Sequence, residues 1–346
     1  MKHLTLFLFF TFSLFTNALT AQSIGEQYNN FVNEAELSII DGDYKRALVK
    51  YNKGFAETGI EFNIDLYNAA VCAHKENNKE QFFLFADRLA DKGVGAELFE
   101  RKVFEDYSGS RAFLKIKQKA KKVRQKNLKA NRQYFLYLDE FRKKDSVYNK
   151  LRLTKYRESW VLPDTLEVLF RNNTINLFNY IKKNGYYSEK KLGVAITLDN
   201  GLDDFKLPSD VFLHYLEMGK DKSLKNEIKE MYISGMKRGE IKPCFLTHYI
   251  EMGNRVFNDI GNYAFKIFEC EIYRLREIPE LDKINKNRRM YLQGSLYDYE
   301  KKLVFAYCCN NDFEFHYSII GSPVSKEDYF YTASDIVGKV KDCSMK

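Results

Sequence analysis

The clearest pattern in the chain is a helical spacing of apolar residues on both sides of a short polar turn. In residues 31–39 the apolar positions recur every fourth residue, which is the spacing of one face of an α-helix. Asp41, Gly42 and Asp43 follow, a combination typical of a turn. The two faces consist of Phe31, Ala35 and Ile39 before the turn, and Ala47, Leu48, Tyr51 and Phe55 after it.

The same arrangement recurs when the chain is shifted against itself by 35 residues. The shift aligns Phe31 with Leu66, and it places Asn77 and Asn78 at a second polar turn. A period of this size indicates a repeat architecture, in which each unit stacks on its neighbours to bury its apolar face. The apolar residues of the second copy are Leu66, Ala69, Ala70, Ala73, Phe82, Phe85, Ala86 and Leu89.

Residues 24–93 resemble the tetratricopeptide repeat. In the first copy, Gly42-Asp43-Tyr44 followed by Ala47, Tyr51 and Gly54 matches the second helix of that family, and Phe31 and Ala35 match its first helix. The second copy departs from the pattern, because Phe82 stands where a small residue is usual. The resemblance implies a stack of helix pairs whose groove binds a protein or peptide. The candidate groove residues are Phe31, Tyr44, Tyr51 and Tyr67.

A third helix pair is expected from Ala96 to about Arg132, because a stack of about three units is needed for stability. Its second helix carries a basic stripe, since no acidic residue lies between Tyr107 and Leu138. A solvated face, an acidic partner and an anionic surface are the alternatives for such a stripe. Its few aromatic residues argue against nucleic acid. The basic surface is expected at Lys115, Lys119, Lys122 and Lys126.

From about residue 131 the repeat signal is lost and other helices are predicted. Apolar stripes begin at Phe135 and Leu166, and Gly185 has the position of a left-handed residue that ends a helix. Later helices are predicted at Pro208–Met218, Ser223–Arg238, Leu246–Phe257 and Asp282–Gln293. We therefore expect an all-α protein, with an α-solenoid in residues 22–130, a second helical domain in 131–302 and a tail in 303–346.

The order of signals in residues 131–300 resembles a bacterial helical domain family of unknown function. Two departures from its pattern are Leu213-His214 in place of Gln-His, and Asn254-Arg255 in place of Asp-Arg. The matching residues are Asp139, Glu140, Arg142, Asn184-Gly185, Ser188, Gly193, His214, Gly239-Glu240-Ile241, Arg255 and Asn287-Arg288-Arg289.

His214 is the candidate for proton transfer in this domain, because an unperturbed histidine titrates near neutral pH. Asp139 or Glu140 would orient it, and Arg142 or Arg255 would hold an anionic group through two parallel hydrogen bonds. The alternative is that His214 and Arg255 only tie helices together. The chain has no phosphate-binding loop and no cysteine or histidine spacing typical of zinc, so neither a cofactor nor a metal is expected.

The last part of the chain alternates aromatic and polar residues on both sides of residues 310–312. Leu303–Cys309 and Phe313–Ile320 are consistent with a small hairpin, or with an irregular tail packed on the last helices. A disulfide from Cys308 or Cys309 to Cys343 and free thiols are both open interpretations. Cys72 lies on an apolar helix face and is interpreted as a core residue.

Residues 1–21 are typical of a cleavable signal peptide. Lys2 and His3 precede an apolar run from Leu4 to Phe15, which is shorter than the ~20 residues of a membrane-spanning helix. Cleavage is expected after Ala21, although Leu19 is larger than the usual residue at its position. Export to the periplasm or the extracellular space makes disulfides possible and argues further against nucleic acid as a partner.

These patterns favour an exported module that binds a protein or peptide through the repeat groove. The competing hypothesis is a hydrolase or transferase activity of the second domain, with His214 and an acidic helper. A third possibility is attachment to an anionic surface through the basic stripe. The composition of the 346-residue chain, with 45% hydrophobic residues and 5 prolines, is that of a helical globular protein.

Overall fold

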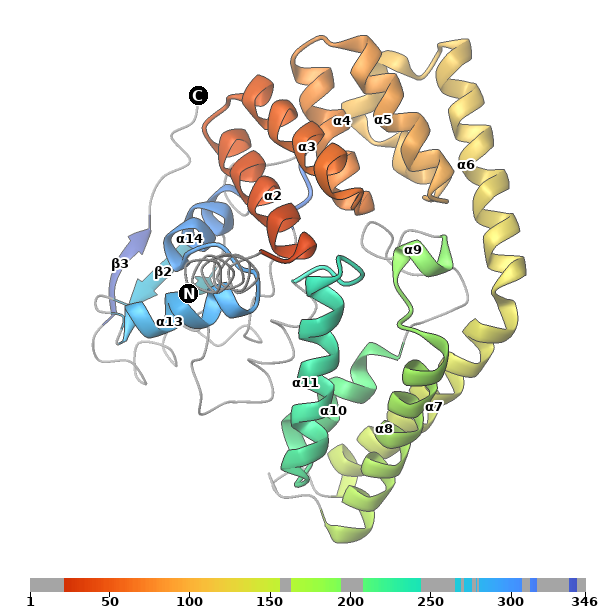
Figure 1. Cartoon of the computed structure of the whole chain (residues 1–346), viewed down its shortest axis with the longest axis vertical. Coiled ribbons are helices and arrows are strands. Elements are labelled where there is room, and N and C mark those ends of the chain that lie inside the picture. The colour runs from red at the N-terminus through yellow and green to blue at the C-terminus, as the bar shows by residue number, and fades with distance from the viewer. Residues whose placement is uncertain are drawn as a thin grey trace, which may run out of the picture.

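The computed structural model describes residues 22–155, 163–193, 208–243, 265–268, 271–275, 278, 280–306, 312–315 and 336–340. Over these residues the chain is mainly α-helical, as the sequence predicts, with one small antiparallel sheet. Figure 1 shows α2 to α6 side by side, α7 continuing below α6, and α8 to α11 returning toward α2. The predicted signal segment and the predicted helix Leu246–Phe257 lie outside the described residues.

Two helix pairs open the described chain. Helix α2 (Ile24–Ile40) packs on α3 (Tyr44–Thr58), and α4 (Asn63–Lys75) packs on α5 (Lys79–Asp91). The two turns use the same local solution. Gly42 and Asn77 each have a positive φ, of 76° and 54°, and the next residue caps the following helix. The stack continues because α3 contacts α4 and α5 contacts α6.

Small residues permit this close packing. Ala35, Ala47 and Ala70 are fully buried between the helices. A side chain at Gly54 would place its Cβ 3.1 Å from the Cβ of Phe31, so the glycine allows α3 to approach α2. Helix α4 is buried around most of its circumference, because α3 and α5 flank it.

The third pair differs from the expected form. Its first member consists of two short 3₁₀-helices, η1 (Ala96–Glu100) and η2 (Lys102–Tyr107), and its second member is α6 (Arg111–Ala130). Arg101, between the 3₁₀-helices, has an extended backbone that interrupts any continuous helix. The aromatic packing of the pair is nevertheless dense, since the rings of Tyr107 and Phe82 stack 3.9 Å apart.

A second hydrophobic core follows the stack. It is built from α7 (Arg132–Lys155), α8 (Asp164–Asn184), the short α9 (Glu189–Leu192), α10 (Ser209–Met218) and α11 (Lys222–Lys237). Helix α10 lies against both α7 and α8. Gly185 ends α8 with a φ of 81°, as predicted from its position.

The C-terminal part adds two helices and the sheet. These are α13 (Leu281–Met290), α14 (Leu296–Val304), β1 (Phe265–Phe268), β2 (Glu271–Leu275) and β3 (Ile336–Val340), with β2 in the centre and antiparallel to both neighbours. The predicted hairpin at 303–320 fares differently: residues 303–306 are helical, and 312–315 form no strand. The rest of that hairpin lies outside the described residues, as do Cys308, Cys309 and Cys343.

Helix α2 holds the parts of the molecule together. It contacts α11 on one side and α14 on another. A Cβ at Gly25 would lie 1.9 Å from the carbonyl oxygen of Met236, so the start of α2 directly abuts α11. A buried ion pair reinforces the contact of α2 with α14, with 2.5 Å between Lys302 Nζ and Glu36 Oε2. A second buried ion pair joins the neighbouring α4 to the loop after α11, with 2.5 Å between Lys242 Nζ and Asp65 Oδ1.

Candidate peptide-binding face

Helices α3 and α4 and the 3₁₀-helices present a polar face that is covered by residues 312–315 of the same chain. We call it the Asn68 face and define it by Tyr44, Tyr67, Asn68, Lys75 and Arg101. Asn68 and Lys75 lie seven residues apart on α4, two helical turns, and therefore point to the same side. Residues 312–315 read Asp-Phe-Glu-Phe and belong to no helix or strand. We call them the resident segment.

Asn68 recognises the backbone of the resident segment. Its amide nitrogen donates to the carbonyl oxygen of Glu314 at 2.8 Å, and its carbonyl oxygen accepts from the N–H of Glu314 at 2.9 Å. The Tyr67 hydroxyl donates to the carbonyl oxygen of Asp312 at 2.8 Å. Asn68 thus pairs with one residue as a neighbouring β-strand would, and it does so from a fully buried position.

The acidic side chains of the segment meet cations. Lys75 Nζ lies 2.5 Å from the Asp312 carboxylate, and Arg101 Nη1 lies 2.5 Å from that of Glu314. Arg101 also lies over the Tyr67 ring, 4.8 Å from its centroid. Burial raises the pKa of Tyr67, opposed by its hydrogen bond and charge interaction with Arg101, so the hydroxyl remains a donor at neutral pH.

The aromatic side chains of the segment meet an apolar surface. The rings of Phe313 and Tyr44 stack 5.8 Å apart, and Phe305 contacts both Phe313 and Phe315. Phe313 is 7% exposed and belongs to the same core cluster as the helix pairs. Residues 312–315 therefore match the irregular interpretation of the tail, but they pack on the first helix pairs and not only on the last helices, as that interpretation expected.

Two of the four predicted groove residues, Tyr44 and Tyr67, contact the segment. Tyr51 is 1% exposed and stacks on Phe55 inside the core, and Phe31 packs against Gly54 beneath Lys53. Asn68, Lys75 and Arg101 were not predicted from the sequence. A signal for Asn68 was present, because it lies between the apolar Leu66 and the apolar run 69–73, and the 35-residue shift aligns it with Asn33.

The half-buried His214 pairs with the buried Asp145 in the second core. Its Nδ1 lies 2.6 Å from Asp145 Oδ2, and its Nε2 lies 3.4 Å from the side-chain amide of Asn149. The other oxygen of Asp145 is buried and has no hydrogen-bond partner among the described residues. This geometry orients an imidazole for proton transfer and equally ties α10 to α7.

The other candidate catalytic residues do not join His214. Asp139 instead binds Arg142 Nε at 2.7 Å and Lys143 Nζ at 2.8 Å, all on α7. The partner of His214 is therefore Asp145, and not Asp139 or Glu140 as expected. Asp139 lies six positions before Asp145 on α7, about 9 Å away along the helix axis, and so does not share its contact with His214. Arg255 lies outside the described residues.

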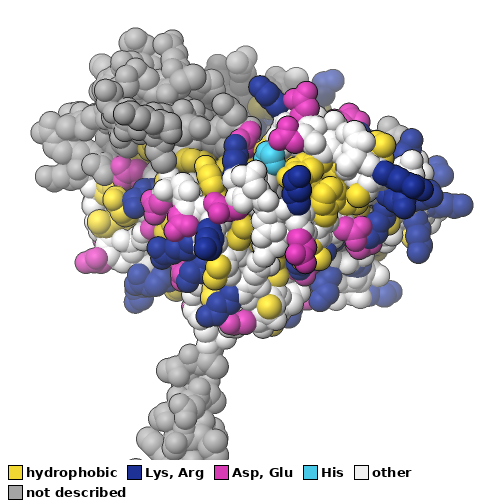
Figure 2. Space-filling model, turned by 90° about the horizontal axis from the view of Figure 1, so that it is seen from above, with side chains coloured by type: hydrophobic (Ala, Val, Ile, Leu, Met, Phe, Trp, Pro, Cys, Tyr) yellow, Lys and Arg dark blue, Asp and Glu magenta, His cyan; other side chains and the backbone are white. Residues whose placement is uncertain are grey.

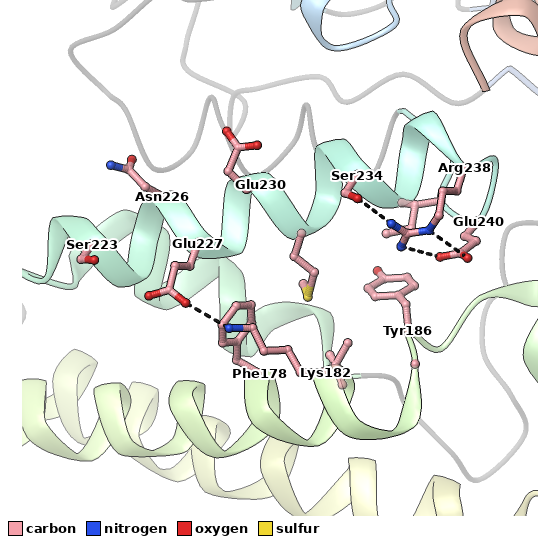
Figure 3. A pocket seen from close by; sticks show the side chains of 14 residues that line it. Phe178, Lys182, Tyr186, Ser223, Asn226, Glu227, Glu230, Ser234, Arg238 and Glu240 are labelled. Carbon is pink, nitrogen blue, oxygen red and sulfur yellow. Dashed lines mark hydrogen bonds and ion pairs between the residues drawn. The ribbon is translucent and has the colours of Figure 1, made fainter. Parts of the chain in front are cut away.

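A hollow of about 700 Å³ lies between α8 and α11 (Figure 3). Four of its five charged side chains form two ion pairs, and Glu230 is the fifth. Lys182 Nζ lies 3.1 Å from Glu227, and Arg238 binds Glu240 at 2.8 Å. An anionic ligand would have to break one of these pairs to reach a cation, so the hollow offers less to an acidic ligand than the Asn68 face.

The expected basic surface lies on α6. Lys115, Lys122 and Lys126 are exposed, whereas Lys119 binds Asp87 and Asp91 at 2.9 and 2.7 Å. Lys and Arg side chains project from the right-hand edge of Figure 2, the side on which α6 lies in Figure 1. Pairing with acidic residues of α5 reduces the charge that the stripe offers to a partner.

Within the part of the chain that the structure describes, no His, Cys, Asp and Glu side chains gather in a group suited to a metal ion. No helix there has the length and apolar character needed to cross a membrane. Comparison of the chain with protein-family models, curated proteins and solved structures finds no significant match.

Proposed function

We propose that this chain is an exported binding module whose helix pairs hold an extended peptide. The observation that supports this proposal best is the double hydrogen bond of Asn68 to the backbone of Glu314. A side chain that binds both backbone groups of one residue accepts many sequences. Backbone bonds of this kind supply affinity, and contacts to alternate side chains supply specificity.

The tetratricopeptide-like pattern supports the same function, since stacked helix pairs present extended surfaces to ligands. Lys75 and Arg101 would select for acidic side chains, and Tyr44 would select for an aromatic ring. The second candidate function is a hydrolase or transferase that uses His214, and the Asp145–His214 pair is the observation that favours it.

A peptide-library experiment tests both functions. The mature chain, residues 22–346, is immobilised and exposed to a random library of synthetic twelve-residue peptides, and retained and cleaved peptides are identified by mass spectrometry. We expect retained peptides whose binding falls at least tenfold in Asn68→Leu. Asn52→Leu is the matched control, because Asn52 is half-buried and its side chain bonds to Gln81 on α5.

Retention that Asn68→Leu leaves unchanged would contradict the proposed function. Cleavage or modification of the peptides that His214→Gln abolishes would favour the enzyme. Tyr51→Ala is unsuited to this experiment, because Tyr51 lies in the core and its loss would destabilise the helix pairs.

A further inference from the structure

The resident segment alternates acidic and aromatic residues, and three of its four side chains meet a residue of the Asn68 face, while Phe315 packs on Phe305. Asp312 and Glu314 alternate with Phe313 and Phe315. In an extended chain, alternate side chains point to opposite sides. The acidic pair meets Lys75 and Arg101, and the aromatic pair meets Tyr44 and Phe305.

These contacts fix the register of the resident segment on the Asn68 face. Asn68 binds only the backbone of Glu314, so it sets where the segment lies without reading its side chains. A shift by one residue would turn the carboxylates toward Tyr44 and the phenyl rings toward the cations. The face therefore discriminates between acidic-aromatic and aromatic-acidic order in peptides of identical composition.

We propose that residues 312–315 are a resident pseudo-ligand of the Asn68 face, and that an external extended peptide with the same acidic-aromatic alternation displaces them. The inference rests on the proposed function and adds the chemical class of the ligand. The face is then closed in the isolated chain and opens when a matching peptide competes.

The resident segment and an external peptide compete for the same Asn68 face. A segment of the same chain has a high effective concentration at the face, so it lowers the apparent affinity of any external peptide. Two of the contacts that retain it are ion pairs whose carboxylates are about one third or more exposed, with exposed fractions of 33% for Asp312 and 41% for Glu314. Neutralising Asp312 and Glu314 weakens these ion pairs and frees the Asn68 face for an external peptide, while the residues of the face stay unchanged.

The test measures binding of a fluorescein-labelled peptide that copies residues 310–317 to the mature chain by fluorescence anisotropy. The proteins are the wild type and the double variant Asp312→Asn/Glu314→Gln, whose neutral side chains keep their size and leave the core intact. We expect the double variant to bind the peptide at least tenfold more tightly than the wild type. Adding Asn68→Leu to the double variant should remove this gain.

A second peptide with the core order Phe-Asp-Phe-Glu controls for composition, and we expect it to bind the double variant at least tenfold more weakly. In a double variant that also carries Arg101→Glu, the copied peptide should bind weakly, because its glutamate meets a negative charge in place of the Arg101 guanidinium. A peptide with lysine at the Glu314 position should restore binding to that variant. Equal affinity of the wild type and the double variant would overturn the pseudo-ligand, and equal affinity for both peptide orders would overturn the ligand class.

The two proposals fail separately. If the copied peptide binds neither protein while library peptides bind through Asn68, the pseudo-ligand is wrong and the peptide-binding function stands. If no peptide of either kind depends on Asn68, both are wrong.

Discussion

Asn33 and Asn68 stand at the same place in two successive helix pairs, and both receive a late part of the chain. The Asn33 side-chain oxygen accepts from Lys302 Nζ at 2.5 Å, and its amide donates to Asp298 at 3.3 Å, both from α14. Asn68 binds Glu314 in the next pair. Asn68 is fully buried and Asn33 is half-buried, and a buried amide is costly unless its hydrogen bonds are made, so these two asparagines mark where the C-terminal part docks.

Asp139 illustrates a candidate catalytic residue whose role is structural. Its side chain is 9% exposed, and burial alone would raise its pKa. The hydrogen bonds from Lys143 and Arg142 outweigh burial, and the pKa is lowered from the ordinary value of 3.8. A carboxylate with a lowered pKa stabilises the fold above its unfolded pKa, and this contribution is lost as the pH falls through the folded pKa.

We therefore expect Asp139→Asn to lower the melting temperature at pH 7, and the difference from the wild type to shrink below about pH 4. Thermal unfolding followed by circular dichroism between pH 3 and pH 7 measures it. Glu140→Gln controls for loss of one negative charge, since Glu140 is an exposed neighbour on α7. A difference independent of pH would contradict this assignment.

At the scale of elements, local sequence signals correctly predicted the turns and helix ends, because neighbouring residues determine these features. The turns at Gly42 and Asn77, their capping residues and the end of α8 at Gly185 depend on residues close in sequence. Of the helix pair that was predicted from Ala96, the structure contains the second helix, α6, but has two 3₁₀-helices in place of the first. The apolar pattern there suits a helix, whereas the extended backbone at Arg101 places its side chain against Glu314, a contact with a residue 213 positions away.

The contact between α4 and the loop after α11 is a further element-scale feature that no local signal revealed. Asp65 is fully buried, accepts from the Tyr28 hydroxyl at 2.7 Å and binds Lys242 at 2.5 Å. Burial raises the pKa of Asp65, and the charge of Lys242 opposes the rise. Removing one member of a buried pair leaves the other charge uncompensated, which typically costs about 3–5 kcal/mol.

We expect Lys242→Met to lower the free energy of unfolding by about 3 kcal/mol, measured by urea denaturation, because Asp65 would remain buried without its cation. The double variant Asp65→Asn/Lys242→Met should recover part of the loss. Lys220→Met is the control, since Lys220 forms an exposed pair with Asp164 and should change stability little. A double variant less stable than Lys242→Met would show that the charges are not coupled.

At the scale of the whole molecule, the sequence predicted a helical chain and a binding surface on its helix pairs. It did not predict that residues 312–315 cover that surface. Tyr44 and Tyr67 were found because the repeat pattern assigns them to a helix face. Lys75 and Arg101 could not be found, because their partners lie 237 and 213 residues away in the chain. The pair of His214 with Asp145 was missed for the same reason, because the two residues lie 69 positions apart in the chain.

The amide hydrogen of Glu314 reports whether the resident segment occupies the Asn68 face, because it donates to Asn68 there. Residue-resolved hydrogen exchange of the mature chain should show this amide protected in the wild type and in Asn52→Leu. In Asn68→Leu we expect it to exchange at least tenfold faster, and in the wild type it should lose protection when excess copied peptide is added. An amide that exchanges at the unfolded rate in the wild type, or at the same rate in Asn68→Leu, would contradict the account.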